Sequence, residues 1–126
     1  MIVDSAIIVR LQQQARASEG EICGALVGDA RAVRDVWPLL NHSPRSEVSF
    51  LIPARDVLRV EKEAEARGLH VLGFYHSHPR GSAKPSPSDL EQAVPGYIYL
   101  ILAGADVRAW QLRDDRVAFT EVEIST

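Results

Sequence analysis

Residues 76–89 carry the side chains of this sequence that are best suited to chemistry. The stretch reads His-Ser-His-Pro-Arg-Gly-Ser-Ala-Lys-Pro-Ser-Pro-Ser-Asp, so two histidines stand two positions apart and an aspartate ends it. The imidazoles of His76 and His78 and the carboxylate of Asp89 form a three-ligand set for zinc, which leaves the fourth tetrahedral position for water. A structural zinc site closes all four positions, usually with cysteines, and this chain has only Cys23. The pattern therefore predicts a catalytic zinc site.

The residues around the two histidines favour a geometry in which both face one site. Alternate side chains of a strand point the same way, so His76 and His78 would project from one face. The preceding run 71–75 is apolar and rich in strand formers, which predicts a strand that ends near His78. The proline and glycine of the following loop end this strand, and its two later prolines lower the entropy cost of returning Asp89 to the histidines.

The end of the stretch also has a purely structural interpretation. Ser86-Pro87-Ser88-Asp89 is a typical helix start, with serine at the N-cap, proline in the first turn and an acid at N3. Ser88 with Glu91 would form a second possible capping box, and an isolated His-x-His pair is often an ordinary polar strand end. The two interpretations are compatible, because Asp89 can lie in the first helical turn and still face a metal.

Two separate motifs resemble those of the JAMM (MPN-plus, or JAB domain) metalloprotease family. The family signature is His-x-His-Pro, six residues and Ser-x-x-Asp, which 76–89 matches residue for residue. The family also carries a glutamate before a Cys-Gly-x-Leu-x-Gly strand, and this chain has Glu21-Ile22-Cys23-Gly24-Ala25-Leu26-Val27-Gly28. The two matches occur in the family's order, and with the length of the chain they indicate a small prokaryotic-type member.

The resemblance implies a role for each motif residue. His76, His78 and Asp89 would hold one zinc ion per chain. Glu21 would act as general base toward the attacking water, and Ser86 would donate a hydrogen bond to the oxyanion of the tetrahedral intermediate. The residues alone do not select one glutamate of the chain as the base; the resemblance selects Glu21.

The activity that the resemblance implies is hydrolysis of a peptide or isopeptide bond after the C-terminal Gly-Gly tail of a ubiquitin-like protein. A sulfur-carrier protein that bears an added amino acid is an equally open substrate. An extended tail can add a strand to a sheet edge, and we expect its groove between 41–50 and the strand before His76. Neither the substrate-binding residues nor the oligomeric state follows from the sequence.

Other functional classes stay open at this point. The chain could be a non-catalytic MPN-type protein-binding scaffold, although inactive relatives usually lack ligand residues that this chain retains. A DNA-repair-associated relative has a similar His-x-His-Pro motif but is longer, with an extra N-terminal region. A zinc deaminase needs a Pro-Cys-x-x-Cys pair, which a chain with one cysteine cannot supply. Cys23 is expected to be a small buried hydrophobe, and His42 is a groove residue, a surface residue or a fourth ligand.

Length and composition favour a single domain over residues 1–126. An apolar share of 46% and a charged share of 25% are ordinary for a soluble globular protein. A net charge of -3 without a basic patch makes nucleic acid a poor partner. No run reaches the roughly 18 apolar residues that span a membrane, and no secretory signal is visible, so we expect a cytoplasmic protein without membrane contact.

The rest of the chain alternates helical and strand patterns that would position the motif residues. No Rossmann glycines and no P-loop occur in it. We therefore expect a mixed α/β fold with a curved, largely antiparallel sheet flanked by helices, which is also the JAB/MPN-like, cytidine-deaminase-like architecture that the resemblance implies. Periodicity and capping residues predict helices from Asp4 or Ser5, over 53–67 and over 89–94, and strands over 21–27, 32–40, 48–52, 70–78, 97–102, 107–112 and 117–124.

Overall fold

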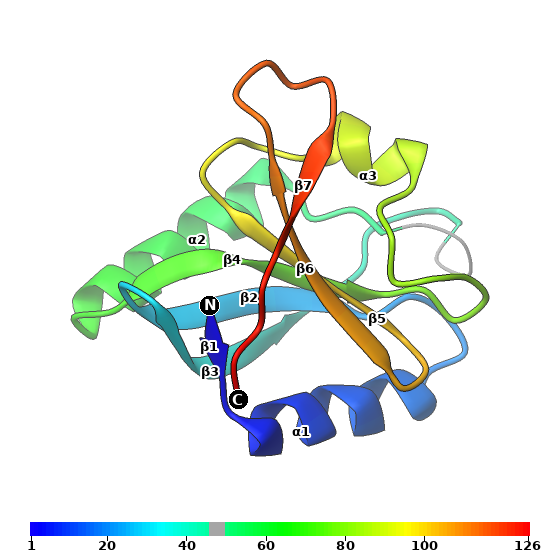
Figure 1. The fold of residues 1–126 in the computed structure, drawn as a ribbon. Helices are drawn as coiled ribbons and strands as arrows, with labels where there is room; N and C mark the ends of the chain where they lie inside the picture. Colours follow the sequence, from blue (N-terminus) through cyan, green and yellow to red (C-terminus); the bar gives the residue numbers. More distant parts are fainter. Residues whose placement is uncertain (46–49) are drawn as a thin grey trace.

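The chain folds around one mixed sheet, and the computed structural model describes residues 1–45 and 50–126 of it. Within these ranges the sheet has seven strands in the order β1-β3-β2-β4-β5-β6-β7, accompanied by three helices (Figure 1). The pairs β1–β3 and β4–β5 are parallel and the other neighbouring pairs are antiparallel. The expected mixed α/β fold with a curved, largely antiparallel sheet is confirmed. The elements are β1 (Ile2–Val3), α1 (Ser5–Arg16), β2 (Cys23–Asp29), β3 (Ala32–Leu39), α2 (Ala54–Ala66), β4 (His70–Ser77), α3 (Pro87–Gln92), β5 (Ile98–Ala103), β6 (Asp106–Leu112) and β7 (Phe119–Val122).

Helix α1 begins at Ser5 as expected, and α2 covers 54–66 where 53–67 was expected. The Asp4 side chain accepts a hydrogen bond from the Ala6 N–H at 3.0 Å and caps α1. Pro53 precedes α2, and Asp56 in its first turn complements the helix dipole. Gly68, with φ of +71°, lies just beyond the end of α2 in the left-handed conformation that glycine adopts most readily.

The strand predicted over 48–52 is wrong where it can be compared. Residues 48 and 49 lie outside the described residues, and 50–52 form no strand. The reason is that side chains form hydrogen bonds with backbone groups that a neighbouring strand would otherwise pair with. The Leu51 N–H donates to Asn41 Oδ1 at 3.0 Å, and Gln92 Nε2 donates to the Phe50 carbonyl at 2.7 Å.

Several element bounds also differ from the prediction. Glu21 and Ile22 precede the sheet, because β2 begins only at Cys23. The short helix starts at Pro87 rather than at Asp89, since Ser86 is its N-cap. The last strand covers 119–122 instead of 117–124, and the two-residue β1 was not expected. Ends of elements are set by caps and neighbouring strands, which periodicity does not encode.

Helices α1 and α2 cover opposite faces of the sheet. Consecutive side chains of a strand point to opposite faces, so consecutive residues of the central strands enter two different apolar clusters. Both faces of these strands are buried, which explains why their sequences are nearly continuous apolar runs. The cluster with Leu11 of α1 contains Leu26, Tyr75 and Leu100, and the cluster with Val60 of α2 contains Ala25, Phe74 and Tyr99.

The central strands bring distant parts of the sequence to one edge. β2 and β4 are antiparallel with Cys23 opposite His76, so the residues before β2 lie beside the end of β4. Gly73 lets β5 approach β4 closely, because a Cβ atom there would lie 1.7 Å from the Ile98 carbonyl oxygen. Of the helices that the structure describes, none is long and apolar enough to cross a membrane.

Candidate metal centre

The end of β4 presents two imidazoles to one point. His76 is fully buried near the end of β4, and His78 follows the strand directly. Their Nε2 atoms lie 3.1 Å apart. The His78 N–H donates to the Leu102 carbonyl of β5 at 2.8 Å, which extends the backbone pairing by one residue and fixes the second imidazole.

Asp89 reaches the histidines from the first turn of α3. Its N–H donates to Ser86 Oγ at 3.1 Å, and its Oδ2 accepts from the Ser86 N–H at 2.8 Å, which completes a capping box. The same Oδ2 lies 3.2 Å from Nε2 of His76 and 3.2 Å from Nε2 of His78. Asp89 therefore caps the helix and faces both imidazoles at once, and the alternative box of Ser88 with Glu91 is wrong.

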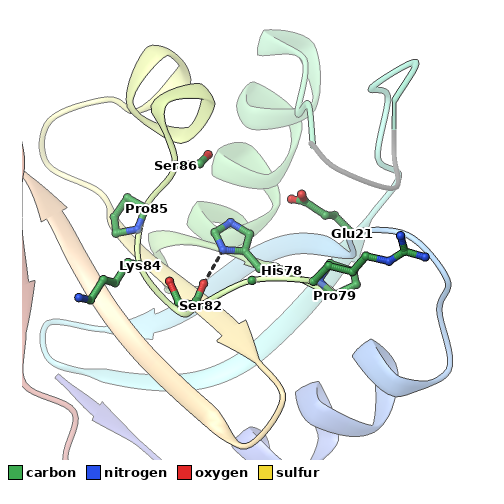
Figure 2. Close-up of a pocket in the computed structure, with 9 residues that line it drawn as sticks. Glu21, His78, Pro79, Ser82, Lys84, Pro85 and Ser86 are labelled. Carbon is green, nitrogen blue, oxygen red and sulfur yellow. Dashed lines mark hydrogen bonds between the residues drawn. The ribbon is translucent and has the colours of Figure 1, made fainter.

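The loop 79–86, which we call the metal loop, fixes the orientation of the His78 ring. His78 Nδ1 lies 2.7 Å from the Ser82 carbonyl oxygen (Figure 2). A carbonyl oxygen can only accept, so Nδ1 carries a hydrogen, and whenever the ring is neutral its Nε2 presents a lone pair toward Asp89. Metal-binding histidines commonly use their second ring nitrogen in this way.

The spacing of these three atoms fits a zinc-sized cation. Nε2 of His76, Nε2 of His78 and Oδ2 of Asp89 form a triangle with edges of 3.1, 3.2 and 3.2 Å. Ligand atoms about 2.0–2.1 Å from a tetrahedral zinc ion are about 3.3 Å apart. Atoms that turn lone pairs toward one another at this distance repel unless a proton or a cation lies between them. The chemistry and spacing of the donor set are those of a metal site.

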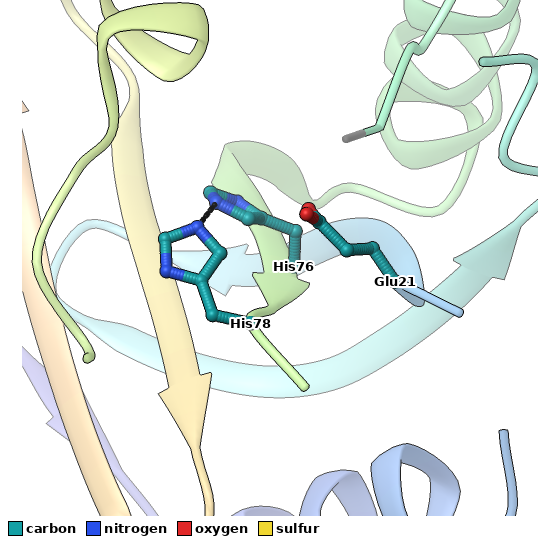
Figure 3. A group of neighbouring side chains, drawn as sticks. All are labelled: Glu21, His76 and His78. Atoms are coloured by element: carbon teal, nitrogen blue, oxygen red, sulfur yellow. Dashed lines mark hydrogen bonds between the residues drawn. The ribbon is translucent and has the colours of Figure 1, made fainter. Parts of the chain in front are cut away.

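Glu21 offers a second carboxylate beside the imidazoles. Its side chain is 6% exposed, and Glu21, His76 and His78 each provide a ligand-type atom, all within 4.8 Å of one another (Figure 3). Among the described residues, its Oε1 has no hydrogen-bond partner. The geometry thus allows Glu21 either to complete a ligand set or to exchange a proton with a group held at the histidines.

The two carboxyl groups have opposite pKa shifts. Burial raises the pKa of Glu21 to about 7, although His78 opposes the shift. Burial would also raise the pKa of Asp89, but His76 and His78, which donate hydrogen bonds to this carboxylate when their rings are protonated, hold its pKa well below the usual range. A carboxylate that stays ionised suits a metal ligand, whereas one that titrates near neutrality suits proton transfer. Neighbouring carboxyl groups whose pKa values are shifted in opposite directions typically have different roles, here those of ligand and of acid–base group.

A cleft of about 320 Å³ opens beside these groups. It is lined by Glu21, His78 and the loop that runs from Pro79 to Ser86, and Figure 2 shows the side chains of Glu21, His78 and Ser86 around one space. The capping bond uses a lone pair of Ser86 Oγ, so the hydroxyl hydrogen is left to donate to a bound molecule. The structure brings together all five residues that the motifs singled out.

Two other residues named from the sequence lie apart from this centre. Cys23 is buried, and burial raises the pKa of its thiol to about 12, as suits the small hydrophobe that was predicted. His42 Nε2 lies 3.4 Å from Asp56 Oδ2 at the start of α2. The His42 side chain thus contacts α2 and is outside the group of His76, His78 and Asp89.

Sequence reasoning missed two residues that contact the centre. The Phe50 ring stacks on His76 with the ring centroids 4.1 Å apart and 22° between the planes. The Asn41 side chain donates to the Glu21 carbonyl at 3.0 Å. No local pattern could have revealed either contact, because each joins segments that only the folded sheet brings together.

Comparison with known proteins identifies relatives of this chain. Residues 5–113 match the family described as prokaryotic homologs of the JAB domain. A desampylase of Haloferax volcanii is 38% identical over 84 residues, which cover 64% of this chain and 60% of that protein. A probable TtuB-protein conjugate cleaving protease of Thermus thermophilus is 39% identical over 82 residues, which cover 65% of this chain and 55% of that protein. The chain thus spans less than two thirds of the length of these two relatives.

Solved structures agree with the sequence comparison. The solution structure of a Desulfitobacterium hafniense protein has a TM-score of 0.83 and 30% identity, covering 99% of this chain and 92% of that one. A JAB1/MPN domain protein of Archaeoglobus fulgidus has a TM-score of 0.65 at 19% identity, covering 98% and 96%, and shows the shared fold. The family match covers most of the chain, and the resemblance inferred from the two motifs is confirmed: the chain belongs to the prokaryotic homologs of the JAB domain.

Proposed function

We propose that this chain is a zinc-dependent hydrolase that cleaves the peptide or isopeptide bond after the Gly-Gly tail of a ubiquitin-like or sulfur-carrier protein. The observation that carries the proposal is the convergence of His76, His78 and Asp89 beside Glu21 in one cleft. The name of the Thermus relative, a probable TtuB-protein conjugate cleaving protease, supports protein conjugates as the substrate class.

The ligand set in this proposal is His76, His78 and Asp89. Zinc bound there would lower the pKa of a water molecule from 15.7 to about 7 and polarise the scissile carbonyl. The capping box holds the Asp89 carboxylate in place, and the Ser82 carbonyl orients His78. Stacking of Phe50 restricts the orientation of the His76 ring.

Glu21 is the general base. It accepts a proton as water oxygen adds to the scissile carbonyl carbon, and it returns this proton to the amine nitrogen as the carbon–nitrogen bond breaks. Its pKa, raised by burial to about 7, lets the carboxyl group hold and release a proton near neutral pH. The products are the free Gly-Gly carboxylate and the released amine.

Ser86 is the oxyanion donor. Its Oγ accepts from the Asp89 N–H, which leaves the hydroxyl hydrogen to donate within the cleft that Ser86 lines together with Glu21 and His78. We expect Ser86→Ala to lower kcat by on the order of 100- to 1,000-fold, the usual effect of losing one such donor. The same change removes a helix cap worth about 1 kcal/mol of stability. Steady-state kinetics together with thermal unfolding separates the two effects.

Ser88 provides the matched control for this prediction. It lies in the same helix start but takes no part in the capping box. Ser88→Ala should keep kcat within about threefold of the wild type. A Ser86→Ala variant that loses stability but keeps its kcat would show that Ser86 serves only as a cap.

The tail of the substrate is proposed to lie along the segment 41–50. Residues 46–49 of this segment lie outside the described residues, and Phe50 is the first described residue after them. Phe50 also lines an apolar hollow of about 400 Å³ between α2 and the segment after α3, next to the metal centre. Apolar side chains of a tail or of its globular domain would suit this hollow.

Cleavage of defined conjugates tests the proposed function. The zinc-loaded chain is incubated with a ubiquitin-like protein joined through its Gly-Gly tail either to a lysine side chain or to an α-amino group. We expect cleavage after the second glycine, abolished by a chelator and restored by zinc, and no cleavage when the tail ends in Ala-Ala. Zinc binding without cleavage of any conjugate would contradict the proposal and favour the non-catalytic scaffold.

A further inference from the structure

Among the described residues, the side chain of Asn41 makes three hydrogen bonds, which join it to Glu21, Ser43 and Leu51. Its Nδ2 donates to the Glu21 carbonyl, and its Oδ1 accepts from the Ser43 N–H and the Leu51 N–H, each at 3.0 Å. The N–H groups of Ser43 and Leu51 need an acceptor, which is the amide oxygen, and the Glu21 carbonyl needs a donor, which is the amide NH₂ group. The network therefore fixes which way the Asn41 amide points.

Glu21 depends on such side-chain contacts because it lies before the start of β2. The next residue, Ile22, is tied to the histidine-bearing strand: its N–H donates to Ser77 Oγ at 3.0 Å, and its carbonyl accepts from the Ser77 N–H at 3.1 Å. The Glu21 carbonyl is held from the other side by Asn41. The backbone of Glu21 and Ile22 is thus held between Ser77 at the end of β4 and the side chain of Asn41.

The placement of this backbone decides where the Glu21 carboxylate lies. Its buried Oε1 has no hydrogen-bond partner in the described ranges, so no hydrogen bond there orients this oxygen. Packing and the position of the backbone must therefore aim it at His76 and His78. A displacement of about 1 Å at a reacting group can reduce a rate by on the order of 100-fold.

We infer that Asn41 is a positioning residue for the general base, which couples the place of Glu21 to the backbone at Ser43 and Leu51. The inference rests on the proposed function, in which Glu21 transfers the proton. The far end of the same segment also contacts the centre, because Phe50 stacks on His76. A substrate that packs against Asn41 and Phe50 would therefore act on both Glu21 and His76.

Two substitutions separate the bonds that Asn41 makes. Asn41→Asp keeps an oxygen for the Ser43 and Leu51 N–H groups but loses the donor to the Glu21 carbonyl. Asn41→Ala loses all three bonds. We expect Asn41→Asp to lower kcat by about 10- to 100-fold with KM within about threefold, and Asn41→Ala to raise KM as well. Both should keep about one zinc ion per chain, because neither touches the ligand set.

A charge control and a double-mutant cycle make the interpretation specific. Gln14 lines the same hollow as Glu21 and Asn41, so Gln14→Glu adds a negative charge there without touching the Glu21 carbonyl. It should keep kcat within about threefold. If Asn41 acts through Glu21, Asn41→Asp should not slow the residual reaction of Glu21→Gln further. Equal losses in both backgrounds, or wild-type kcat for Asn41→Asp, would overturn the inference.

Hydrogen exchange tests the same contacts without any activity measurement. In Asn41→Asp, the Ile22 amide should exchange at least about tenfold faster, while the Leu51 amide keeps its protection. In Asn41→Ala, both amides should exchange faster. Unchanged Ile22 exchange in both variants would refute the positioning role. If the two variants show this exchange pattern but the wild-type chain cleaves no conjugate, the proposed function alone is refuted.

Discussion

Glu21→Gln should abolish most hydrolysis while the protein keeps its fold and about one zinc ion per chain. Glutamine has nearly the same shape as glutamate, and the Asn41 contact to the residue 21 carbonyl does not involve the side chain. An amide cannot take up the proton, so we expect kcat to fall by on the order of 100- to 10,000-fold. The measurement is steady-state cleavage of a Gly-Gly conjugate beside elemental analysis of the same preparations.

Glu19 supplies the control for this variant, and zinc content supplies the decisive second readout. Glu19 is an exposed carboxylate close by in the same segment, so Glu19→Gln should cleave within about twofold of the wild type. If Glu21→Gln loses zinc along with activity, Glu21 is a ligand in a set with His76 and His78. Normal cleavage by Glu21→Gln would remove it from the mechanism.

Asp89→Ala should empty the site of metal. Asp89 Oδ2 is one corner of the ligand triangle, and a catalytic zinc site with two remaining protein ligands binds weakly. We expect zinc below about one tenth of an ion per chain after dialysis and a fall in kcat/KM of on the order of 1,000-fold or more. Elemental analysis and kinetics measure both. Loss of the cap should also lower stability by about 1 kcal/mol.

Asp89→Asn separates the ligand from the cap. The asparagine oxygen can still accept the Ser86 N–H, so helix α3 should keep its cap, whereas a neutral amide is a weak zinc ligand. Zinc content should therefore fall in Asp89→Asn with little change in thermal unfolding. Stoichiometric zinc in Asp89→Ala would contradict the ligand set and leave Asp89 as a capping residue.

The part of the site that the sequence predicts is the part encoded locally. His76 and His78 are two positions apart on one strand, and Ser86 with Asp89 forms a helix cap, so short-range spacing determines most of their geometry. The Asp4 cap of α1 was predictable for the same reason. Asp89 shows that two local interpretations of one residue need not compete, since one oxygen serves both.

The parts that escaped prediction depend on contacts between distant segments. Residues 50–52 have the composition of a strand, but the side chains of Asn41 and Gln92 bind their backbone instead. Glu21 was expected inside a strand and lies before it, because the ladder of β2 starts at Cys23. Hydrophobic periodicity records which face of an element is buried; it does not record which polar side chain will meet a given backbone group.

The parallel pairing of β4 with β5 determines which segment of the chain carries the reactive residues. Two parallel neighbours cannot be joined by a tight turn, so the polypeptide must travel back along the sheet before β5 can begin. Residues 78–97 form this crossover connection, which includes the metal loop, Ser86 and Asp89. The topology would require a connection of this kind even in a protein that had no catalytic or metal-binding residues. The reactive residues thus occupy a segment that the architecture already demands, and the sheet needs no inserted loop to carry them.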